Sequence, residues 1–318
     1  MKAVILDGYA FNPGDLSWDE LFQLADFTVY DRTKPEEVLA RAHNAEAVFT
    51  NKVVFDRPVL DQLPLLRYIG VLATGYNVVD TAAAREKGID VTNIPAYGTE
   101  SVAQWTFTHL LNLSSKLVES HTAVSQGEWV NCKDYCFWKS PLIELAGKTL
   151  GIVGFGAIGR RVAALAQAFR MKVLAYGPHL QPGQTIDGVS AVSLDDLLAK
   201  SDFVSLHCPL NAGSQKMINA YTLIKMKRGA CLINTGRGGL IDEKAVANAL
   251  ASGQLAGVGV DVLSTEPPLA NNPLLTAKNC YITPHNAWAT LEARSRLMAT
   301  AIANFQAFLQ GKPQNVVN

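Results

Sequence analysis

Short apolar runs alternate with amphipathic stretches along almost the whole chain, which is typical of parallel sheets whose strands are joined by helices. In the first hundred residues, apolar runs predict strands at 2–7, 27–31, 47–50, 66–72 and 90–94. Amphipathic segments at 35–42 and 79–88 predict helices between them, and a long helix is expected at about 100–119. This part of the chain has no glycine fingerprint of its own.

A second series of strands begins at Lys148. We expect these strands at 149–155, 172–177, 203–208, 230–236, 256–262 and 280–285. An amphipathic helix is predicted at 288–311, and its apolar positions need a partner surface: Leu291, Leu297, Ile302, Phe305 and Leu309. Because the second series of strands is complete before this helix, we expect the helix to return to the first domain. The predicted fold class is α/β, with a discontinuous domain of residues 1–100 plus 286–318, a second domain of residues 101–285, and a cleft between them.

The first strand of the second series leads into a glycine-rich loop. Gly154, Gly156 and Gly159 have the spacing G-x-G-x-x-G and open an amphipathic helix. In such loops the glycines permit a sharp turn, a close approach of the backbone to a pyrophosphate, and tight packing of helix on strand. The helix N-terminus directs free N–H groups toward the phosphates. An empty structural turn is the alternative, but the strand expected at 172–177 favours a Rossmann-type dinucleotide site.

Composition narrows the class of protein. The chain has 318 residues, with 28 basic and 28 acidic side chains, so net charge gives no argument for a nucleic-acid or membrane partner. No signal peptide is visible, and no apolar run approaches the roughly 20 residues that span a bilayer. The five cysteines are few and odd in number, which suits a reduced, cytoplasmic protein. Cys132 and Cys136 lack a second Cys/His pair nearby, so no metal site is predicted.

Reactive side chains follow three strand ends of the second domain: Arg237, Glu266 and His285. A histidine beside a carboxylate can act as a general acid, and an arginine offers a planar fork for a substrate carboxylate. This set suits protonation of the carbonyl of a 2-oxo acid while a nicotinamide cofactor supplies hydride.

Each of these residues also has a purely structural interpretation. Arg237 would then be a surface arginine in a glycine turn. Glu266 would cap the diproline turn that follows it, and His285 would be a hydrogen-bonded histidine at a strand end. A further histidine, His207, also ends a strand, and its neighbour Pro209 favours a place in the cofactor surround over acid–base chemistry.

Seven segments together resemble the D-isomer-specific 2-hydroxyacid dehydrogenase family over nearly the full length of the chain. They are VLATGYNVVD at 71–80, NIPAYGTESVAQ at 93–104, GIVGFGAIGR at 151–160, SLHCPL at 205–210, NTGRGGLIDE at 234–243, GVDVLSTEPP at 259–268 and ITPHNAW at 282–288. Their order and spacing are much more specific than any single segment.

The resemblance implies an enzyme with two Rossmann-like domains and parallel sheets. Arg237 would hold the substrate carboxylate, and Glu266 would orient and charge His285. The backbone of three residues would help to bind the same carboxylate: Ala73, Thr74 and Gly75. Cofactor contacts would come from the glycine loop, later strand ends and the helix expected near residue 100: Gly154, Gly156, Ala157, Ile158, Gly159, Gly177, His207, Cys208, Pro209, Thr235, Asp261, Thr99 and Val102.

The chain departs from the family pattern at the ribose position. Many NAD-preferring members carry an acidic residue about 20 residues beyond the glycine loop. Here the chain reads Tyr176, Gly177, Pro178 and His179, which neither repels a 2′-phosphate nor clearly captures one. We therefore expect NAD(H) and do not exclude NADP(H). Gln104 stands where a glutamate is expected, and HNAW replaces a glycine-bearing HxxG.

The substrate expectation also rests on resemblance. The DYCFW segment at 134–138 looks like that of hydroxypyruvate-reducing members, which are glycerate dehydrogenases. Glyoxylate, D-lactate, 3-phosphoglycerate and phosphite are alternative substrates of related enzymes. A binding protein of another class, a dinucleotide-sensing co-repressor, is the other alternative, although an intact Arg237, Glu266 and His285 set argues against it.

Large aromatic residues are concentrated between positions 129 and 138, where no regular period is visible: Trp129, Tyr135, Phe137 and Trp138. They either pack locally under a loop or form an arm exchanged across a homodimer. In the second case the family resemblance implies that Trp138 reaches the substrate pocket of the neighbouring subunit.

Overall fold

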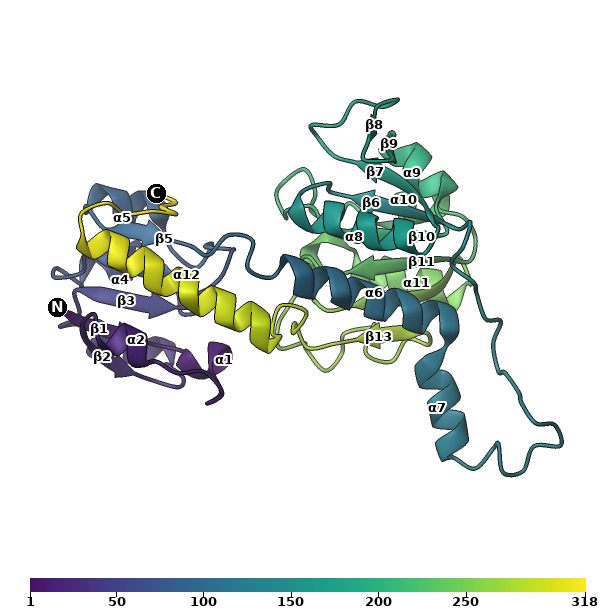
Figure 1. Ribbon diagram of the computed structural model, residues 1–318, viewed down its shortest axis with the longest axis horizontal. Coiled ribbons are helices and arrows are strands. Elements are labelled where there is room, and N and C mark those ends of the chain that lie inside the picture. The colour runs from purple at the N-terminus through teal and green to yellow at the C-terminus, as the bar shows by residue number, and fades with distance from the viewer. The chain divides into compact units, whose positions relative to one another are not determined.

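The computed structural model describes all 318 residues, and they divide into two compact units (Figure 1). The first unit contains Met1–Gly98 and Ala289–Asn318, and the second contains Thr99–Trp288. The sequence analysis placed the two crossings at 100–101 and 285–286. No helix is both long and apolar enough to cross a membrane.

The first unit is a parallel sheet covered by several short helices and one long helix. Its strand order is β2-β1-β3-β4-β5, with β1 Lys2–Ile5, β2 Asp26–Val29, β3 Ala47–Thr50, β4 Tyr68–Val71 and β5 Asp90–Thr92. Its helices are α1 Gly8–Phe11, α2 Asp19–Phe22, η1 Pro35–Glu37, α3 Val38–Ala42, α4 Arg57–Asp61, α5 Thr81–Glu86 and α12 Leu291–Leu309. The strands β3 and β4 are buried along their whole length, which explains their continuous apolar runs.

The final helix, α12, packs on this first unit, as its apolar face required. The ring of Phe305 lies 5.2 Å from that of Tyr68 and 5.3 Å from that of Phe49, measured between centroids. Two of the predicted partner positions are wrong, because Leu291 and Leu309 lie near the ends of the helix and are 48% and 40% exposed.

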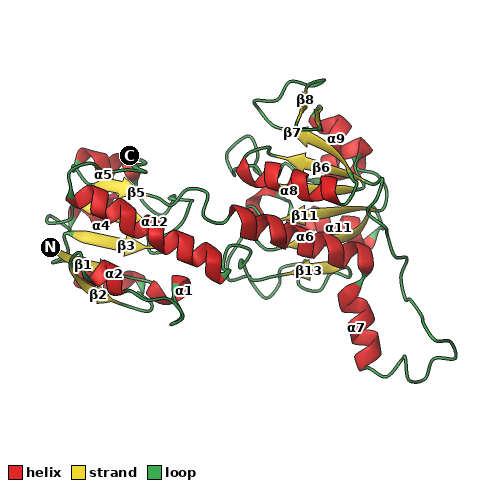
Figure 2. Cartoon of the chain, in the orientation of Figure 1, coloured by secondary structure: helices red, strands yellow, loops and turns green.

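The second unit is built on an eight-stranded sheet with the order β13-β12-β11-β10-β6-β7-β9-β8. Figure 2 shows its strands in yellow, with helices packed against them. The strands are β6 Thr149–Val153, β7 Lys172–Tyr176, β8 Thr185–Ile186, β9 Val189–Ala191, β10 Phe203–Leu206, β11 Ala230–Asn234, β12 Leu255–Val260 and β13 Cys280–Ile282. All neighbours pair in parallel except β8 and β9. The sequence analysis missed this antiparallel hairpin, because its strands have only 2 and 3 residues.

The helices of the second unit are α6 Thr99–Ser115, α7 Leu117–Ser125, α8 Ala157–Ala168, α9 Leu194–Lys200, α10 Ala220–Lys225, the short η2 Gly238–Leu240 and α11 Glu243–Ala251. One long helix predicted at 100–119 is therefore two helices. The break occurs at Lys116, which has a left-handed backbone with φ of 54°. Helices α6 and α8 lie side by side on one face of the sheet (Figure 1).

Parallel pairing brings the carboxyl ends of the central strands to one edge of this sheet. Backbone hydrogen bonds continue past the strands at that edge: the N–H of His207 donates to the carbonyl of Val153 at 2.7 Å, and the N–H of Asp261 donates to the carbonyl of Asn234 at 3.0 Å. The residues that follow β6, β10, β11 and β12 are thereby neighbours, although they are far apart in the sequence. This edge is where ligands bind in open α/β sheets.

Candidate active site

The glycine loop after β6 has the geometry that a dinucleotide requires. Gly154 has φ of 96°, and a Cβ there would lie 2.4 Å from the backbone nitrogen of Cys208. A Cβ on Gly159 would lie 2.2 Å from the carbonyl oxygen of Gly154, so the helix α8 packs directly on the turn. A Cβ on Gly156 would meet nothing within 4 Å. Gly156 opens α8 as its N-cap, and the first N–H groups of a helix have no intrahelical acceptor. The loop is closed toward the protein and open where a pyrophosphate would approach.

The end of β7 has room for a Cβ atom at Gly177, although this residue is buried. Gly177 has no positive φ, and a Cβ placed on it would lie 3.7 Å from the backbone nitrogen of Phe155 in the glycine loop. That distance is an ordinary van der Waals contact. Residue 177 therefore lies beside the loop that would hold the pyrophosphate, without a steric requirement for glycine.

The end of β10 carries a neutral histidine. The ring Nε2 of His207 lies 2.8 Å from the hydroxyl of Ser205, and burial lowers the pKa of His207 from 6.5 to about 4. A histidine with that pKa does not donate a proton from an imidazolium at neutral pH. The next residue, Cys208, donates from its thiol to the sulfur of Met217, and burial raises the pKa of that thiol. Pro209 is exposed and accepts a hydrogen bond from Ser214.

The end of β11 is joined to the start of α6 by hydroxyl groups. The hydroxyl of Thr106 donates to the carbonyl of Val102 at 2.9 Å, and it lies 3.0 Å from the hydroxyl of Thr235. Since Thr106 has one hydroxyl proton, Thr235 must donate to it, which leaves the lone pairs of Thr235 for another donor. Thr99 begins α6 one turn before Val102.

Arg237 lies in the loop after β11, and its guanidinium group contacts no carboxylate of the chain. Its side chain is exposed, and its Nη1 donates to the carbonyl of Gly236 at 2.8 Å. The backbone beneath it is fixed, because the buried Asn234 donates to the carbonyl of Arg237. A Cβ on Gly238 would lie 1.9 Å from the carbonyl carbon of Leu263, so glycine allows this loop to touch the loop that carries Glu266.

Glu266 and His285 form the shortest contact between the reactive side chains. The Oε2 of Glu266 lies 2.6 Å from the Nδ1 of His285, while its Oε1 accepts the backbone N–H of Leu263 at 3.0 Å. The carboxylate is therefore held at one oxygen and contacts the imidazole with the other. This contact assigns the proton of a neutral His285 to Nδ1, while the protonated ring also carries a proton at Nε2, which is available to a substrate.

The backbone of His285 is held in an uncommon conformation by Asp261. His285 has φ of 51°, a left-handed geometry that costs a non-glycine residue on the order of 1–3 kcal/mol. Its N–H donates to the carbonyl of Asp261 at 2.7 Å. The buried carboxylate of Asp261 accepts the N–H groups of Asn286 at 3.1 Å and Ala287 at 2.8 Å. Burial is the largest influence on this carboxyl and raises its pKa. The position predicted as a cofactor contact thus anchors the histidine loop.

In the first unit, the loop after β4 presents free backbone amides. The carbonyl of Ala73 accepts from the N–H of Ile94, and the hydroxyl of Thr74 donates to the carbonyl of Ile94. The carbonyl of Thr74 accepts from the side chain of Asn93 at 2.8 Å. The N–H groups of Ala73, Thr74 and Gly75 donate to no group of the chain. The loop is thus fixed through its carbonyl groups and the hydroxyl of Thr74, and its successive backbone N–H groups remain available to an anion.

The sequence analysis missed Asp7, a buried carboxylate at the end of β1. It accepts the N–H groups of Asn51 at 2.8 Å and Lys52 at 2.6 Å, and burial raises its pKa. An aspartate after a short strand carries no sequence signal of such contacts. Its role in the structure is to hold the turn that follows β3.

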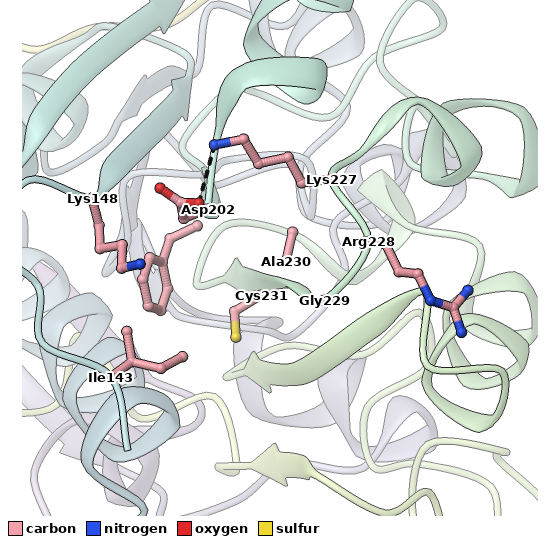
Figure 3. A pocket seen from close by; sticks show the side chains of 9 residues that line it. Ile143, Lys148, Asp202, Lys227, Arg228, Gly229, Ala230 and Cys231 are labelled. Carbon is pink, nitrogen blue, oxygen red and sulfur yellow. Dashed lines mark hydrogen bonds and ion pairs between the residues drawn. The ribbon is translucent and has the colours of Figure 1, made fainter. Parts of the chain in front are cut away.

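A pocket of about 140 Å³ lies at the other edge of the second unit's sheet (Figure 3). It is lined at the amino ends of β6, β10 and β11 by Lys148, Asp202 and Cys231, among others. The ammonium group of Lys227 turns to Asp202, at 3.0 Å, whereas Arg228 points away. Because the reactive residues follow the carboxyl ends, this pocket is not part of their site. No group of three or more potential metal ligands is found in the chain.

An aromatic segment extends away from the second unit after α7 (Figure 1). Tyr135 and Trp138 are 90% and 68% exposed, and Trp129 is half exposed. The indole of Trp129 donates to the carbonyl of Tyr135 at 3.0 Å, and Lys139 pairs with Glu128 at 2.7 Å. These bonds shape the segment, which we call the arm (residues 126–147). Trp129, Tyr135 and Trp138 remain exposed, whereas Phe137 is partly buried.

Known proteins resemble this chain over its whole length. The family model of the D-isomer specific 2-hydroxyacid dehydrogenase, NAD binding domain, matches residues 107–287. A hydroxypyruvate reductase of Blautia hydrogenotrophica is 48% identical, with 100% of both chains covered. A glycerate dehydrogenase of Methylorubrum extorquens is 42% identical, with 92% of both chains covered. Among solved structures, an acyclic imino acid reductase in complex with NADPH and D-Arg has a TM-score of 0.88 and 30% identity, with both chains fully covered.

These matches confirm the family resemblance, the α/β fold with two Rossmann-like domains and the assignment as an oxidoreductase. They also confirm a nicotinamide dinucleotide as the cofactor. The open glycine loop after β6 agrees with that cofactor. The chain therefore belongs to the D-isomer specific 2-hydroxyacid dehydrogenase family.

Proposed function

We propose that this enzyme reduces hydroxypyruvate to D-glycerate with NADH, and that it also accepts NADPH. The observation that carries the reaction is the 2.6 Å contact between Glu266 and His285 beside the strand ends of the dinucleotide-binding unit. The choice of substrate is supported by the relatives of 48% and 42% identity, which are named for hydroxypyruvate and glycerate.

The substrate carboxylate is assigned to Arg237, whose fork has no carboxylate partner within the chain. A guanidinium fork grips a carboxylate with two parallel hydrogen bonds. The free amides of Ala73, Thr74 and Gly75 are the second set of donors proposed for the same group. Two sets of donors would fix the orientation of a 2-oxo acid and leave its C2 oxygen to a proton donor.

His285 is assigned as that proton donor. The bound nicotinamide supplies the hydride that reaches the C2 carbon. His285 gives the proton of its Nε2 to the C2 oxygen, and Glu266 stabilises the positive charge that the ring carries before the transfer. In the opposite direction, the same nitrogen accepts the proton of the hydroxyl group. Thr235, with acceptor lone pairs at the end of β11, is a candidate partner for the carboxamide of the cofactor.

The proposed tolerance for NADPH rests on the end of β7. Position 177 is a glycine close to Phe155 of the glycine loop, and Pro178 and His179 beyond it are exposed. No carboxylate at this strand end repels a 2′-phosphate or accepts from the ribose hydroxyls.

We further propose a homodimer in which the arm crosses to the neighbouring subunit. The exposure of Tyr135 and Trp138 supports this assignment over local packing, because large exposed rings on an extended segment usually mark a partner surface. Trp138 is the candidate for a residue that completes the neighbouring substrate site. Mixing Trp138→Ala subunits with Arg237→Ala subunits tests it. Activity returns on mixing if Trp138 acts across the dimer, because one site then has both residues. Heterodimers without recovered activity would contradict the assignment.

The substrate proposal is tested by NADH oxidation with hydroxypyruvate, measured beside glyoxylate, pyruvate and a reaction without substrate. We expect the highest kcat/KM with hydroxypyruvate, and a product consumed by an enzyme specific for D-glycerate. A higher kcat/KM with glyoxylate, or an L-configured product, would contradict the proposal.

A further inference from the structure

One face of helix α6 contacts the loop that carries His285. Ser101, Trp105 and His109 are spaced four residues apart, so their side chains lie along one side of the helix. The hydroxyl of Ser101 donates to the carbonyl of Ala287. Trp105 and His109 both reach the hydroxyl of Thr283, which lies two residues before His285.

The hydroxyl of Thr283 is the centre of this network. It donates to the carboxylate of Asp261 at 2.6 Å. The indole N–H of Trp105 donates to it at 3.0 Å, and the Nε2 of His109 lies 3.2 Å away. A hydroxyl has one proton and two lone pairs. Since its proton is used by Asp261, both α6 side chains must act as donors, and the hydroxyl is then saturated.

This arrangement requires a neutral His109 with its proton on Nε2. The side chain is buried, and burial lowers the pKa of His109 from 6.5 to about 4, so the ring is uncharged at neutral pH. Its ring packs directly on β12, because a Cβ on Gly259 would lie 2.8 Å from the Cγ and the Nδ1 of His109. The ring therefore has little freedom to leave Thr283.

The network ends at the backbone of His285. Asp261, which accepts from Thr283, also binds the N–H groups of Asn286 and Ala287, and its carbonyl accepts the N–H of His285. The loop is thus held on both sides of the left-handed residue, by Asp261 and by α6. In a buried network of this kind, in which each hydrogen-bonding group has a partner, the loop that carries His285 is held in a single conformation.

We propose that Trp105 and His109, acting through Thr283 and Asp261, are positioning residues that set the place of the His285 ring for proton transfer. This inference rests on the proposed role of His285 as the proton donor. Displacement of a reacting group by about 1 Å can cost about a hundredfold in rate. The expected consequence of breaking the network is a lower kcat with little change in the KM for the 2-oxo acid.

The test compares Thr283→Val with Thr283→Ser. Valine keeps the shape and removes the hydroxyl, so Trp105, His109 and Asp261 each lose a partner, whereas serine keeps the hydroxyl. We expect kcat to fall by about a hundredfold in Thr283→Val and to recover in Thr283→Ser. The isotope effect with deuterated NADH should rise in Thr283→Val, because the chemical step becomes slower than product release. Thr108→Val is the matched control, since this exposed hydroxyl on α6 bonds only to the carbonyl of Gln104.

Variants of Trp105 and His109 separate positioning from folding. Trp105→Phe keeps a ring and loses the N–H donor, and His109→Gln keeps a donor. We expect the first to lower kcat and raise the isotope effect, and the second to remain closer to the wild type than His109→Leu. If Thr283→Val does not fold, as judged by its melting curve, Trp105→Phe decides the question by the same measurements.

The ¹⁵N resonances of the His285 ring give a readout that does not depend on turnover. They should shift in Thr283→Val and return in Thr283→Ser. Wild-type resonances together with a wild-type isotope effect in Thr283→Val and Trp105→Phe would overturn the inference. A wild-type protein that reduces no 2-oxo acid would instead count against the proposed function, while the resonances would still report on the network.

Discussion

Replacement of Glu266 by glutamine isolates the electrostatic part of the proposed mechanism. Each carboxylate oxygen of Glu266 has its own donor, the N–H of Leu263 at 3.0 Å and the Nδ1 of His285 at 2.6 Å. A glutamine has one oxygen, so its amide nitrogen must face one of these two donors. Hydrogen bonds to a charged group contribute about 1.5–3 kcal/mol. The side chains of His285 and Glu266 are 26% and 36% exposed, and solvent therefore moderates the loss.

We expect kcat/KM for reduction to fall by about ten- to a hundredfold in Glu266→Gln, since each 1.4 kcal/mol is about a tenfold change in rate. Solvent screening favours the lower end of this range. Steady-state NADH oxidation measures it, and NADH fluorescence titration should show unchanged cofactor binding. Glu243→Gln is a matched control, because its carboxylate accepts from Ser264 and Asn272 and not from His285. Equal kinetics in Glu266→Gln and wild type would refute the assigned role of Glu266.

Three further predictions concern the guanidinium group of Arg237, the choice of cofactor and the pH dependence of stability. Arg237→Lys should raise KM and lower kcat, together by more than about tenfold in kcat/KM, because an ammonium cannot form the bidentate pair; rates over a range of hydroxypyruvate concentrations measure this. Gly177→Asp should depress kcat/KM with NADPH more than with NADH, since a Cβ fits at position 177 and a carboxylate there would repel a 2′-phosphate; equal effects would show that residue 177 does not face the ribose. Burial lowers the pKa of His109 to about 4 in the folded protein. Below about pH 6.5, the unfolded state therefore binds more protons than the folded state. The free energy of unfolding should consequently decrease as the pH falls from about 6.5 to about 4. Urea unfolding across this range should show a smaller decrease in His109→Gln, and the same slope in both proteins would contradict the burial of a neutral ring.

The sequence predicts most of the parallel strands because strands buried on both faces are continuous apolar runs. The bounds of β3 agree with the predicted strand, and the glycine loop follows β6 as expected. The break between α6 and α7 could not be predicted, because Lys116, whose backbone is left-handed at the break, is neither glycine nor proline. The exposed ends of α12 were missed for a related reason, since periodicity does not show where a helix runs past its partner surface.

The candidate site was likewise predicted only in part from the sequence. Arg237, Glu266 and His285 could be selected from the sequence because each follows a strand of a parallel sheet, and such ends meet at one edge. The pairing of Glu266 with His285 was expected from the family resemblance, and the structure adds its geometry, a 2.6 Å contact between residues 19 positions apart. Asp261 was expected only as a cofactor contact, and nothing in the sequence connects it through Thr283 with Trp105 and His109, because these residues meet only after folding.

The most direct test of the central claim is the turnover of hydroxypyruvate by His285→Ala. We expect kcat to fall by about a hundred- to ten-thousandfold, which is typical for the loss of a general acid. NADH binding should be retained, because the glycine loop after β6 does not involve His285. Wild-type turnover in this variant, with hydroxypyruvate-dependent NADH oxidation present in the unmodified enzyme, would contradict the assignment of His285 as the proton donor.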